Sequence, residues 1–287
     1  MNNTGTIYLN ESASASLIGG RAENQDNYGS TNTPFGQLFV VCDGMGGGPG
    51  GRTASTTAVN YFIQSIVDGD AQQSCNDIML HAVVTANEKL QQMMSENDEL
   101  RGMGTTLVAV LFNSDAAIVA HVGDSRLYQM HGSKVLFRTE DHSLVADMVR
   151  RGTISEEQAR LSSQSNIILR ALGAGDNHEA QIDVLPYSIG DRFILCTDGV
   201  WGSMPEPELL ACFSRKESLD ILANDIASKV NQIGIDKGGH HDNLTLTIIN
   251  SLASSVMRPQ PSGKVARIKN IIKKICNYIG VVPNDVQ

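Results

Sequence analysis

Short apolar runs that end abruptly on turn-forming residues recur along the chain, and they predict buried strands. Residues 39–42 are apolar and lead directly into Asp43, which is followed by six glycines among residues 44–51. A run of this length bounded by turn formers is typical of a strand in the interior of a sheet. We therefore expect a strand that ends at Asp43, and a glycine loop whose Gly44 carbonyl can face whatever the carboxylate binds.

Two more aspartates lie at the ends of predicted strands. Residues 193–197 run into Asp198-Gly199, and Asp242 comes shortly before a strand predicted at 244–249. Each motif alone predicts only a turn, because Asp-Gly after an apolar run is a common hairpin signal. If the three acids meet at one sheet edge, their carboxylates cannot all ionise without a cation between them. Short carboxylates and a main-chain carbonyl are the hard oxygen ligands that hold Mg²⁺ or Mn²⁺.

The remaining periodicities divide the chain into helices and strands. The helical spacing of apolar residues predicts helices at 52–67, 78–94, 143–151, 155–161, 206–213 and 217–233. Apolar runs predict strands at 105–112, 116–122, 126–130, 134–138, 180–185 and 191–197. The four strands between 105 and 138 are joined by short turns, so we expect them to be antiparallel neighbours. One of these turns contributes a fourth acid, Asp124.

A polar cluster at residues 20–28 contains a candidate phosphate ligand. The planar guanidinium of Arg21 can bind two phosphate oxygens with parallel hydrogen bonds, although an ordinary surface arginine fits the pattern equally well. Asp26 is either an outer acid that holds a metal-bound water or a turn residue. The His240-His241 pair suggests zinc, but third and fourth ligands at zinc spacing are not visible, and we disfavour that site.

Composition and charge narrow the class of protein. The chain has 287 residues, of which 41% are hydrophobic, so it can bury a sizeable core in one large domain or two ordinary ones. The formal net charge is −9, with +5 on residues 251–287 and −14 on residues 1–250. An acidic body argues against nucleic acid as a partner, because affinity for its backbone comes from clustered Lys and Arg.

Cysteine usage and the N-terminal pattern bear on the compartment. The five cysteines are an odd number without a CxxC pair, which favours free thiols in a reducing environment. The polar N-terminus lacks a signal-peptide pattern, and apolar runs stay well below 18 residues. We expect a soluble, cytoplasmic protein.

The pattern also predicts a division into three parts. Residues 1–250 form the main domain, with a polar, serine-rich flap at about 141–175. Ser, Pro and Gly make residues 251–263 a linker. Apolar residues at alternating spacings of three and four make residues 264–287 a basic amphipathic helix. We expect this helix to dock on its own acidic domain or, in falling order of preference, on a partner protein or an anionic membrane surface.

Taken together, these segments resemble the metal-dependent serine/threonine protein phosphatases of the protein phosphatase 2C (PP2C, or PPM) family, in a compact bacterial form. The matching motifs, in the family's order, are Arg21-Ala22-Glu23-Asn24-Gln25-Asp26, Asp43-Gly44-Met45-Gly46-Gly47, Gly104-Thr105-Thr106, Gly123-Asp124-Ser125-Arg126, Asp198-Gly199 and Asp242-Asn243. Each motif is weak alone, but six in order over about residues 15–250 are specific. The resemblance implies an α+β fold in which two antiparallel β-sheets pack as a sandwich with helices on both outer faces.

The resemblance implies a metal-binding role for five residues. Asp43 would bridge two metal ions, and Gly44 would contribute its carbonyl oxygen. Asp198 and Asp242 would complete the protein ligands of the first ion. Asp124 would hold a third, weaker ion together with Asp198. The implied cofactor is Mn²⁺ or Mg²⁺, with two ions in each site.

The implied reaction is hydrolysis of phosphoserine and phosphothreonine by direct attack of a metal-bridging water, whose pKa the two cations lower. Arg21 would bind the phosphate and fix the line of attack, and Asp26 would lie behind the ligands. The substrates would be phosphorylated proteins, and the enzyme would oppose a serine/threonine kinase. Many eukaryotic members carry a histidine directly after the first Asp-Gly as the proton donor, but here Met45 stands there. The proton must come from elsewhere, and His241 is a weak candidate.

Two other functions compete with this one. A pseudo-phosphatase would keep the fold as a binding module without catalysis, although the intact acids at 43, 198 and 242 favour activity. A different two-metal hydrolase, such as a nuclease, is disfavoured by the acidic body and by Arg21 as the lone evident phosphate ligand.

Overall fold

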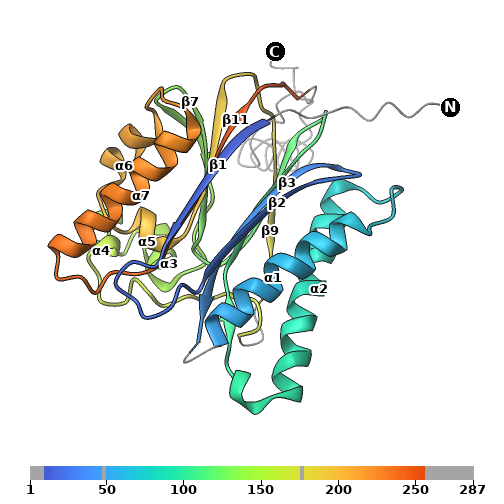
Figure 1. The fold of residues 1–287 in the computed structure, drawn as a ribbon, viewed down its shortest axis with the longest axis horizontal. Coiled ribbons are helices and arrows are strands. Elements are labelled where there is room, and N and C mark those ends of the chain that lie inside the picture. Colours follow the sequence, from blue (N-terminus) through green and yellow to red (C-terminus); the bar gives the residue numbers. More distant parts are fainter. Residues whose placement is uncertain (1–9, 47–49, 175–177, 256–287) are drawn as a thin grey trace, which may run out of the picture. The chain divides into compact units, whose positions relative to one another are not determined.

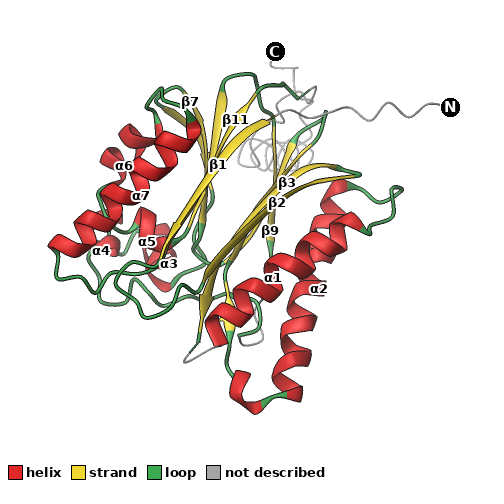
Figure 2. Cartoon of the chain, viewed as in Figure 1, coloured by secondary structure: helices red, strands yellow, loops and turns green. Residues whose placement is uncertain are grey.

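The computed structural model describes residues 10–46, 50–174 and 178–255. Within them, two antiparallel sheets pack face to face and helices cover their outer faces (Figures 1 and 2). This arrangement confirms the α+β sandwich that the family resemblance implied.

The first sheet has the strand order β1-β11-β10-β7-β8. Its strands are β1 (Asn10–Leu17), β7 (Arg126–His131), β8 (Lys134–Arg138), β10 (Asp191–Cys196) and β11 (Leu244–Ser251). Strand β1 is rich in serine, and it pairs with β11 along its whole length. The first and last described strands of the chain therefore lie side by side.

The second sheet has the order β2-β3-β5-β6-β9, and a short strand, β4, adds to one end of β3. Its strands are β2 (Asp26–Thr33), β3 (Gly36–Met45), β4 (Gly104–Thr105), β5 (Leu107–Phe112), β6 (Ala117–Val122) and β9 (Gln181–Leu185). Strand β2 was not predicted, because its sequence DNYGSTNT is polar and it lies at the edge of the sheet.

Helices cover each sheet from outside (Figure 1). Helix α1 (Gly50–Val67) lies beside β2 and β3, and α2 (Cys75–Glu96) packs on α1 and contacts β6. Beside the first sheet lie α5 (Asp198–Trp201), α6 (Glu206–Phe213) and α7 (Leu219–Asp236). The predicted flap region contains two short helices, α3 (Leu144–Arg150) and α4 (Glu156–Arg160), each with a serine N-cap. A short 3₁₀ turn, Asp98–Leu100, follows α2.

Aromatic rings fill the space between the sheets. Phe112 of the second sheet meets Phe193 of the first edge to face, with ring centroids 4.8 Å apart. Phe39 and Tyr187 pack against the same Phe112 ring. All four are at least 97% buried, and burying each such side chain contributes about 2–3 kcal/mol. This core holds the two sheets together at the end of the strands away from Asp43 and Asp198, because Phe112 pairs with Gln37 at the start of β3 and Phe193 lies near the start of β10.

Two predictions about the strands were wrong. Strands β6 and β7 are not neighbours: β6 pairs with β5 and β9, whereas β7 pairs with β10 and β8. The turn at 123–125 therefore carries the chain from one sheet to the other, and Gly123 takes the positive φ (+99°) that this path requires. Strand β3 does not end at Asp43 but continues to Met45, because β4 supplies a partner for Gly44 and Met45.

Some predictions concern residues that the structure does not describe. The basic helix at 264–287, most of the linker and glycines 47 and 48 lie outside the described residues. Among the described cysteines, Cys42, Cys75, Cys196 and Cys212 are free thiols, as expected. A helix long and apolar enough to cross a membrane does not occur in the described part of the chain.

Candidate functional site

Asp43 lies near the end of β3, where neighbouring strands fix its main chain. In the register of β2 and β3 it stands directly opposite Asp26. Its N–H donates to Thr106 Oγ1 at 2.9 Å, and its carbonyl accepts from Thr105 Oγ1 at 2.8 Å and from the Thr106 N–H at 2.9 Å. The two threonines therefore hold residue 43 from the side opposite Asp26.

Gly44 is required because main chain crowds it on two sides. A Cβ there would lie 2.0 Å from the Gly51 carbonyl oxygen and 2.6 Å from that of Gln25. The Gly44 N–H donates to Gln25 O at 3.2 Å. A side chain at position 44 would push the start of α1 away from β3.

Asp198 is the first residue of the short helix α5, directly after β10. The next residue, Gly199, packs so closely that a Cβ on it would lie 1.9 Å from the Asn243 carbonyl oxygen. This contact brings Asp198 beside the loop that carries Asp242. The Asp43 carboxyl also lies within electrostatic reach of Asp198, whose negative charge adds to burial in raising the pKa of Asp43.

Asp242 forms an ion pair with Arg21. Arg21 Nη2 and Asp242 Oδ2 are 2.7 Å apart, with 54% and 39% of the two side chains exposed. Two glycines allow this approach: a Cβ on Gly19 would lie 2.1 Å from Asp242 O, and Gly20 donates its N–H to His241 O at 3.0 Å. The predicted phosphate ligand is thus placed next to the acids and reaches solvent.

Asn243 ties the Arg21 segment to the rest of the site. Its Oδ1 accepts from the Gln25 N–H at 2.9 Å, and its Nδ2 donates to the carbonyls of Ile18 at 2.7 Å and Glu23 at 2.9 Å. All three partners lie on the segment between β1 and β2. One buried amide therefore fixes the path of the residues that flank Arg21.

Asp26 is 8% exposed and lies beneath the other acids. Its Oδ2 accepts a hydrogen bond from Thr197 Oγ1 at 2.9 Å. Burial is the main reason that the pKa of Asp26 rises from 3.8 to about 7, and the negative charges of Asp198 and Asp242 raise it further. Asp26 is thus the first residue of β2 rather than a turn residue, and its carboxyl lies within electrostatic reach of Asp198 and Asp242.

Asp124, on the turn between the sheets, is 2% exposed. Trp201 Nε1 donates to its carbonyl oxygen at 3.0 Å, and the Arg126 guanidinium lies 3.6 Å from the centroid of the Trp201 ring. Arg126 makes two hydrogen bonds to Asp141, of 2.8 and 2.7 Å, at the start of the predicted flap. The fourth acid is thus supported by a buried ion pair and a stacked tryptophan.

The cluster is electrostatically strained without a counter-charge. Burial raises the pKa of the Asp43 carboxyl well above its ordinary value, and repulsion from Asp198 and Asp26 adds to the effect. Burial and the nearby Asp198 likewise raise the pKa of Asp124, and burial followed by Asp242 raises that of Asp198 to about 6. Ionisation of one carboxyl therefore raises the pKa of its neighbours, and a cation among them would relieve this repulsion.

The donor set fits a hard divalent cation. Within the described residues, Asp26 Oδ1, Asp124 Oδ1 and Asp198 Oδ1 are buried without a hydrogen-bond partner. Such oxygens are costly unless something binds them. The carboxylates meet in pairs, and across residues 10–46, 50–174 and 178–255 no three His, Cys, Asp or Glu side chains are already gathered around one metal position. Asp242 does not join such a group because its two carboxylate oxygens already accept hydrogen bonds from Arg21 and from the Asn243 N–H.

Neither His241 nor Met45 is well suited to donate a proton to the leaving group. The Nε2 atom of His241 lies 2.9 Å from Asn231 Oδ1, and its ring packs over Gly234 of α7, where a Cβ would lie 2.1 Å away. This role is structural, which weakens His241 as a proton donor. Met45 pairs with Gly104 in β4.

Sequence reasoning missed the residues that position the acids. The hydrogen bonds that hold Asp43, Asp26 and the Arg21 segment come from Thr105, Thr106, Thr197 and Asn243. All of these except Thr197 belong to the motifs named above, but no role was predicted for them. Polar side chains inside predicted buried strands were the available signal, since buried polar groups need partners.

The comparisons with known proteins agree with this geometry. A family model for protein phosphatase 2C matches residues 15–233. The serine/threonine phosphatase stp of Listeria monocytogenes serotype 4b is 34% identical over 233 residues, which is 80% of this chain and 90% of that protein. Protein phosphatase PhpP of Streptococcus pneumoniae is 30% identical over 237 residues, or 80% of this chain and 92% of that protein.

Solved structures are similar over nearly their whole length. The serine/threonine phosphatase of S. agalactiae has a TM-score of 0.74 and 29% identity, covering 85% of this chain and 100% of that one. The catalytic domain of the serine/threonine protein phosphatase PstP, solved with two manganese ions, has a TM-score of 0.70 and 26% identity, covering 84% and 97%.

Proposed function

The chain belongs to the protein phosphatase 2C family and is a protein serine/threonine phosphatase, and from this premise we propose that its acidic cluster holds two divalent cations for direct hydrolysis of phosphoserine and phosphothreonine. The observation that carries the proposal is the convergence of Asp43, Asp198 and Asp242, from distant parts of the sequence, at one edge of the fold, where Asp242 is partly exposed and paired with Arg21.

The ligand roles follow from where each group lies. Asp43 stands opposite Asp26 in the strand register, and Asp198 and Asp26 both add to burial in raising its pKa, so Asp43 would be the ligand common to both ions, with the Gly44 carbonyl next to it. Asp198 and Asp242 would complete the protein ligands of one ion. Asp124, whose pKa burial and the charge of Asp198 raise, would hold a third and weaker ion together with Asp198. Oxygen ligands of this kind suit Mn²⁺ and Mg²⁺ alike, and Mn²⁺ is favoured by the manganese-bound relative.

The residues of the site have different roles in the proposed reaction. When bound, two divalent cations lower the pKa of water and so supply the nucleophile at neutral pH. Arg21, more than half exposed, exchanges Asp242 for the phosphoryl oxygens and orients them by paired hydrogen bonds. Asp26, which stands opposite Asp43, has a raised pKa. It holds a proton when the cluster has no cations and releases this proton when cations bind. Met45 cannot donate a proton, so the leaving oxygen receives one from a group other than residue 45.

Phosphorylated proteins are the substrates, and we propose that the enzyme opposes a serine/threonine kinase. The acidic body disfavours nucleic acid, because residues 1–250 carry a net charge of −14. Residues 264–287, which lie outside the described part, are proposed to target the enzyme by docking on its own domain or on a partner protein, and less readily on a membrane surface.

The test is Mn²⁺-dependent phosphate release from a small aryl phosphate by the wild type and by Asp43→Asn. We expect Asp43→Asn to lower the rate of phosphate release by more than about 100-fold. A loss of that size exceeds the effect of removing a residue that only hydrogen-bonds to a metal ligand. DNA and RNA, assayed alongside a phosphopeptide, should not be cleaved. A wild type that is inactive in every divalent metal would favour the pseudo-phosphatase, and nuclease activity would favour the other two-metal hydrolase.

A further inference from the structure

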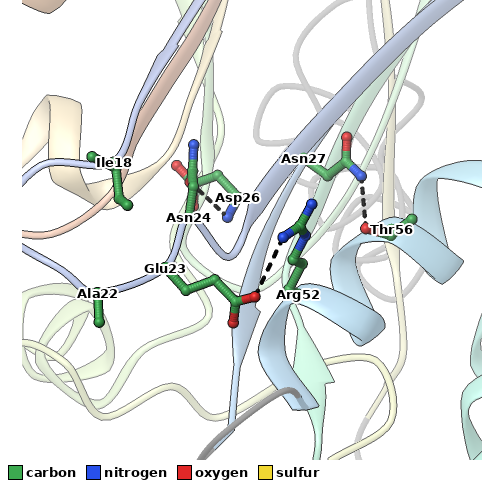
Figure 3. A pocket seen from close by; sticks show the side chains of 8 residues that line it. All are labelled: Ile18, Ala22, Glu23, Asn24, Asp26, Asn27, Arg52 and Thr56. Atoms are coloured by element: carbon green, nitrogen blue, oxygen red, sulfur yellow. Dashed lines mark hydrogen bonds and ion pairs between the residues drawn. The ribbon is translucent and has the colours of Figure 1, made fainter.

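A hollow of about 660 Å³ lies beside the Arg21 segment (Figure 3). One wall is the segment between β1 and β2, with Ile18, Ala22 and Glu23, and the other is the start of α1, with Arg52 and Thr56. None of the ligand roles proposed above uses this hollow, and its walls combine apolar and charged groups.

Each wall of the hollow connects it to the proposed phosphate site. Glu23 is two residues from Arg21 on the same segment, which Asn243 fixes at both Ile18 and Glu23. On the other wall, Arg52 follows Gly51, and a Cβ on Gly51 would lie 2.9 Å from the Gly44 carbonyl oxygen. A peptide whose phosphate lies at Arg21 therefore has this hollow beside it.

Among the described residues that line the hollow, Arg52 is the cation, and the acid that faces it, Glu23, has a side chain that is 36% exposed. The Arg52 side chain is 67% exposed, and its contact with Glu23 is 3.5 Å long, against 2.7 Å between Arg21 and Asp242. The first turn of α1 has no acidic residue, so the positive end of the helix adds to the charge of Arg52. Asp26 lines the same hollow, but it is 8% exposed and its Oδ2 is bound to Thr197.

We propose that this hollow is a specificity site that binds an aspartate or glutamate of the substrate close to its phosphorylated residue. Arg52 takes the carboxylate in competition with Glu23, while the exposed Ile18, 45% accessible, contacts the aliphatic part of the peptide. The Asn27 amide, which donates to Thr56 Oγ1 at 2.9 Å, ties β2 to α1 and so keeps the two walls at a fixed separation. This inference rests on the proposed function, because it assumes a phosphopeptide bound at Arg21.

The experiment compares two phosphopeptides that differ only by Glu or Gln at single positions beside the phosphoserine. The readout is the ratio of kcat/KM for the Glu peptide to that for the Gln peptide. We expect a ratio above one in the wild type, and Arg52→Gln should lower it by about fivefold, as for an exposed ion pair. Glu23→Gln should raise the ratio, because it removes the competing carboxylate. Added salt should lower it.

Arg215→Gln serves as the control, because Arg215 is also a surface arginine paired with acids but follows α6 and pairs with Asp225 of α7. Helices α6 and α7 lie on the other side of the sandwich from α1 (Figure 1). The control should leave the ratio unchanged. A wild type that hydrolyses both peptides equally at every position overturns the inference, and so does an unchanged ratio in both Arg52→Gln and Glu23→Gln. In either case the proposed function stands. It falls instead if the wild type hydrolyses neither the peptides nor an aryl phosphate.

Discussion

At the scale of single residues, the site depends on carboxylates held where they cannot all ionise. Asp26 and Asp43 stand opposite each other across two paired strands, and the negative charge of Asp198, together with burial, raises the pKa of Asp43. Burial raises the pKa of each of them, and the pKa of Asp26 reaches about 7. Protons and divalent cations therefore compete for the same oxygens.

Asp26 gives this competition a measurable pH dependence. Its folded-state pKa lies above its unfolded value, so its protonated form stabilises the fold below pH 3.8, and this contribution is lost as pH rises through about 7. In chelator, the unfolding free energy of the wild type minus that of Asp26→Asn should fall over this window by up to about 4 kcal/mol, at about 1.4 kcal/mol for each pKa unit. Urea titrations from pH 4 to pH 8 measure it.

The difference between the two proteins is the quantity to follow, because Asp43 and Asp198 titrate in both. A difference that stays flat with pH, or rises, would mean that Asp26 ionises normally in the folded protein.

At the scale of elements, short connections bring the acids together. The turn at 123–125 crosses between the sheets, and α5 begins at Asp198. Arg126 stacks on Trp201 of α5 and forms a double hydrogen bond with Asp141, so it links this turn, α5 and the start of the predicted flap. The Arg126 and Asp141 side chains are only 13% and 9% exposed.

Arg126→Lys should therefore destabilise the protein despite the conserved charge. Lysine cannot make the paired hydrogen bonds or the flat stack, and we expect a loss of about 2 kcal/mol or more in unfolding free energy. The matched control is Arg150→Lys, at a pair whose arginine is 65% exposed, where the change should stay below about 0.5 kcal/mol. Equal effects in the two variants would show that the Arg126 pair is not a structural link.

The elements also show how far sequence reasoning reaches. Helices such as α1, α2 and α6 were predicted almost to their ends, because the spacing of their apolar residues indicates where each helix lies. Strand β2 was missed because its polar residues form an edge strand. The neighbours of β6 and β7 were wrong because a short turn does not reveal whether the chain stays in one sheet. The acids were found, but their supporting hydrogen bonds depend on tertiary contacts that local patterns do not contain.

At the scale of the whole molecule, the sequence divides into an acidic body and a basic C-terminal segment. Residues 251–287 carry +5 and residues 1–250 carry −14, whereas every residue of the candidate site lies before position 244. Deletion of residues 258–287 should leave turnover of a small aryl phosphate unchanged and alter localisation or phosphoprotein turnover. Steady-state assays and imaging of the tagged protein measure these effects. Identical localisation and phosphoprotein turnover after deletion would exclude a targeting role.

The central claim is that acids from remote segments bind a pair of divalent cations. Calorimetric titration of Mn²⁺ into chelator-treated protein tests it most directly, with Asp43→Asn as the variant and Asp98→Asn, an exposed acid beyond α2, as the control. The account predicts about two tight sites in the wild type and in the control, and loss of both in Asp43→Asn. A wild type that binds no Mn²⁺, or an Asp43→Asn variant that binds it as the wild type does, would contradict the account.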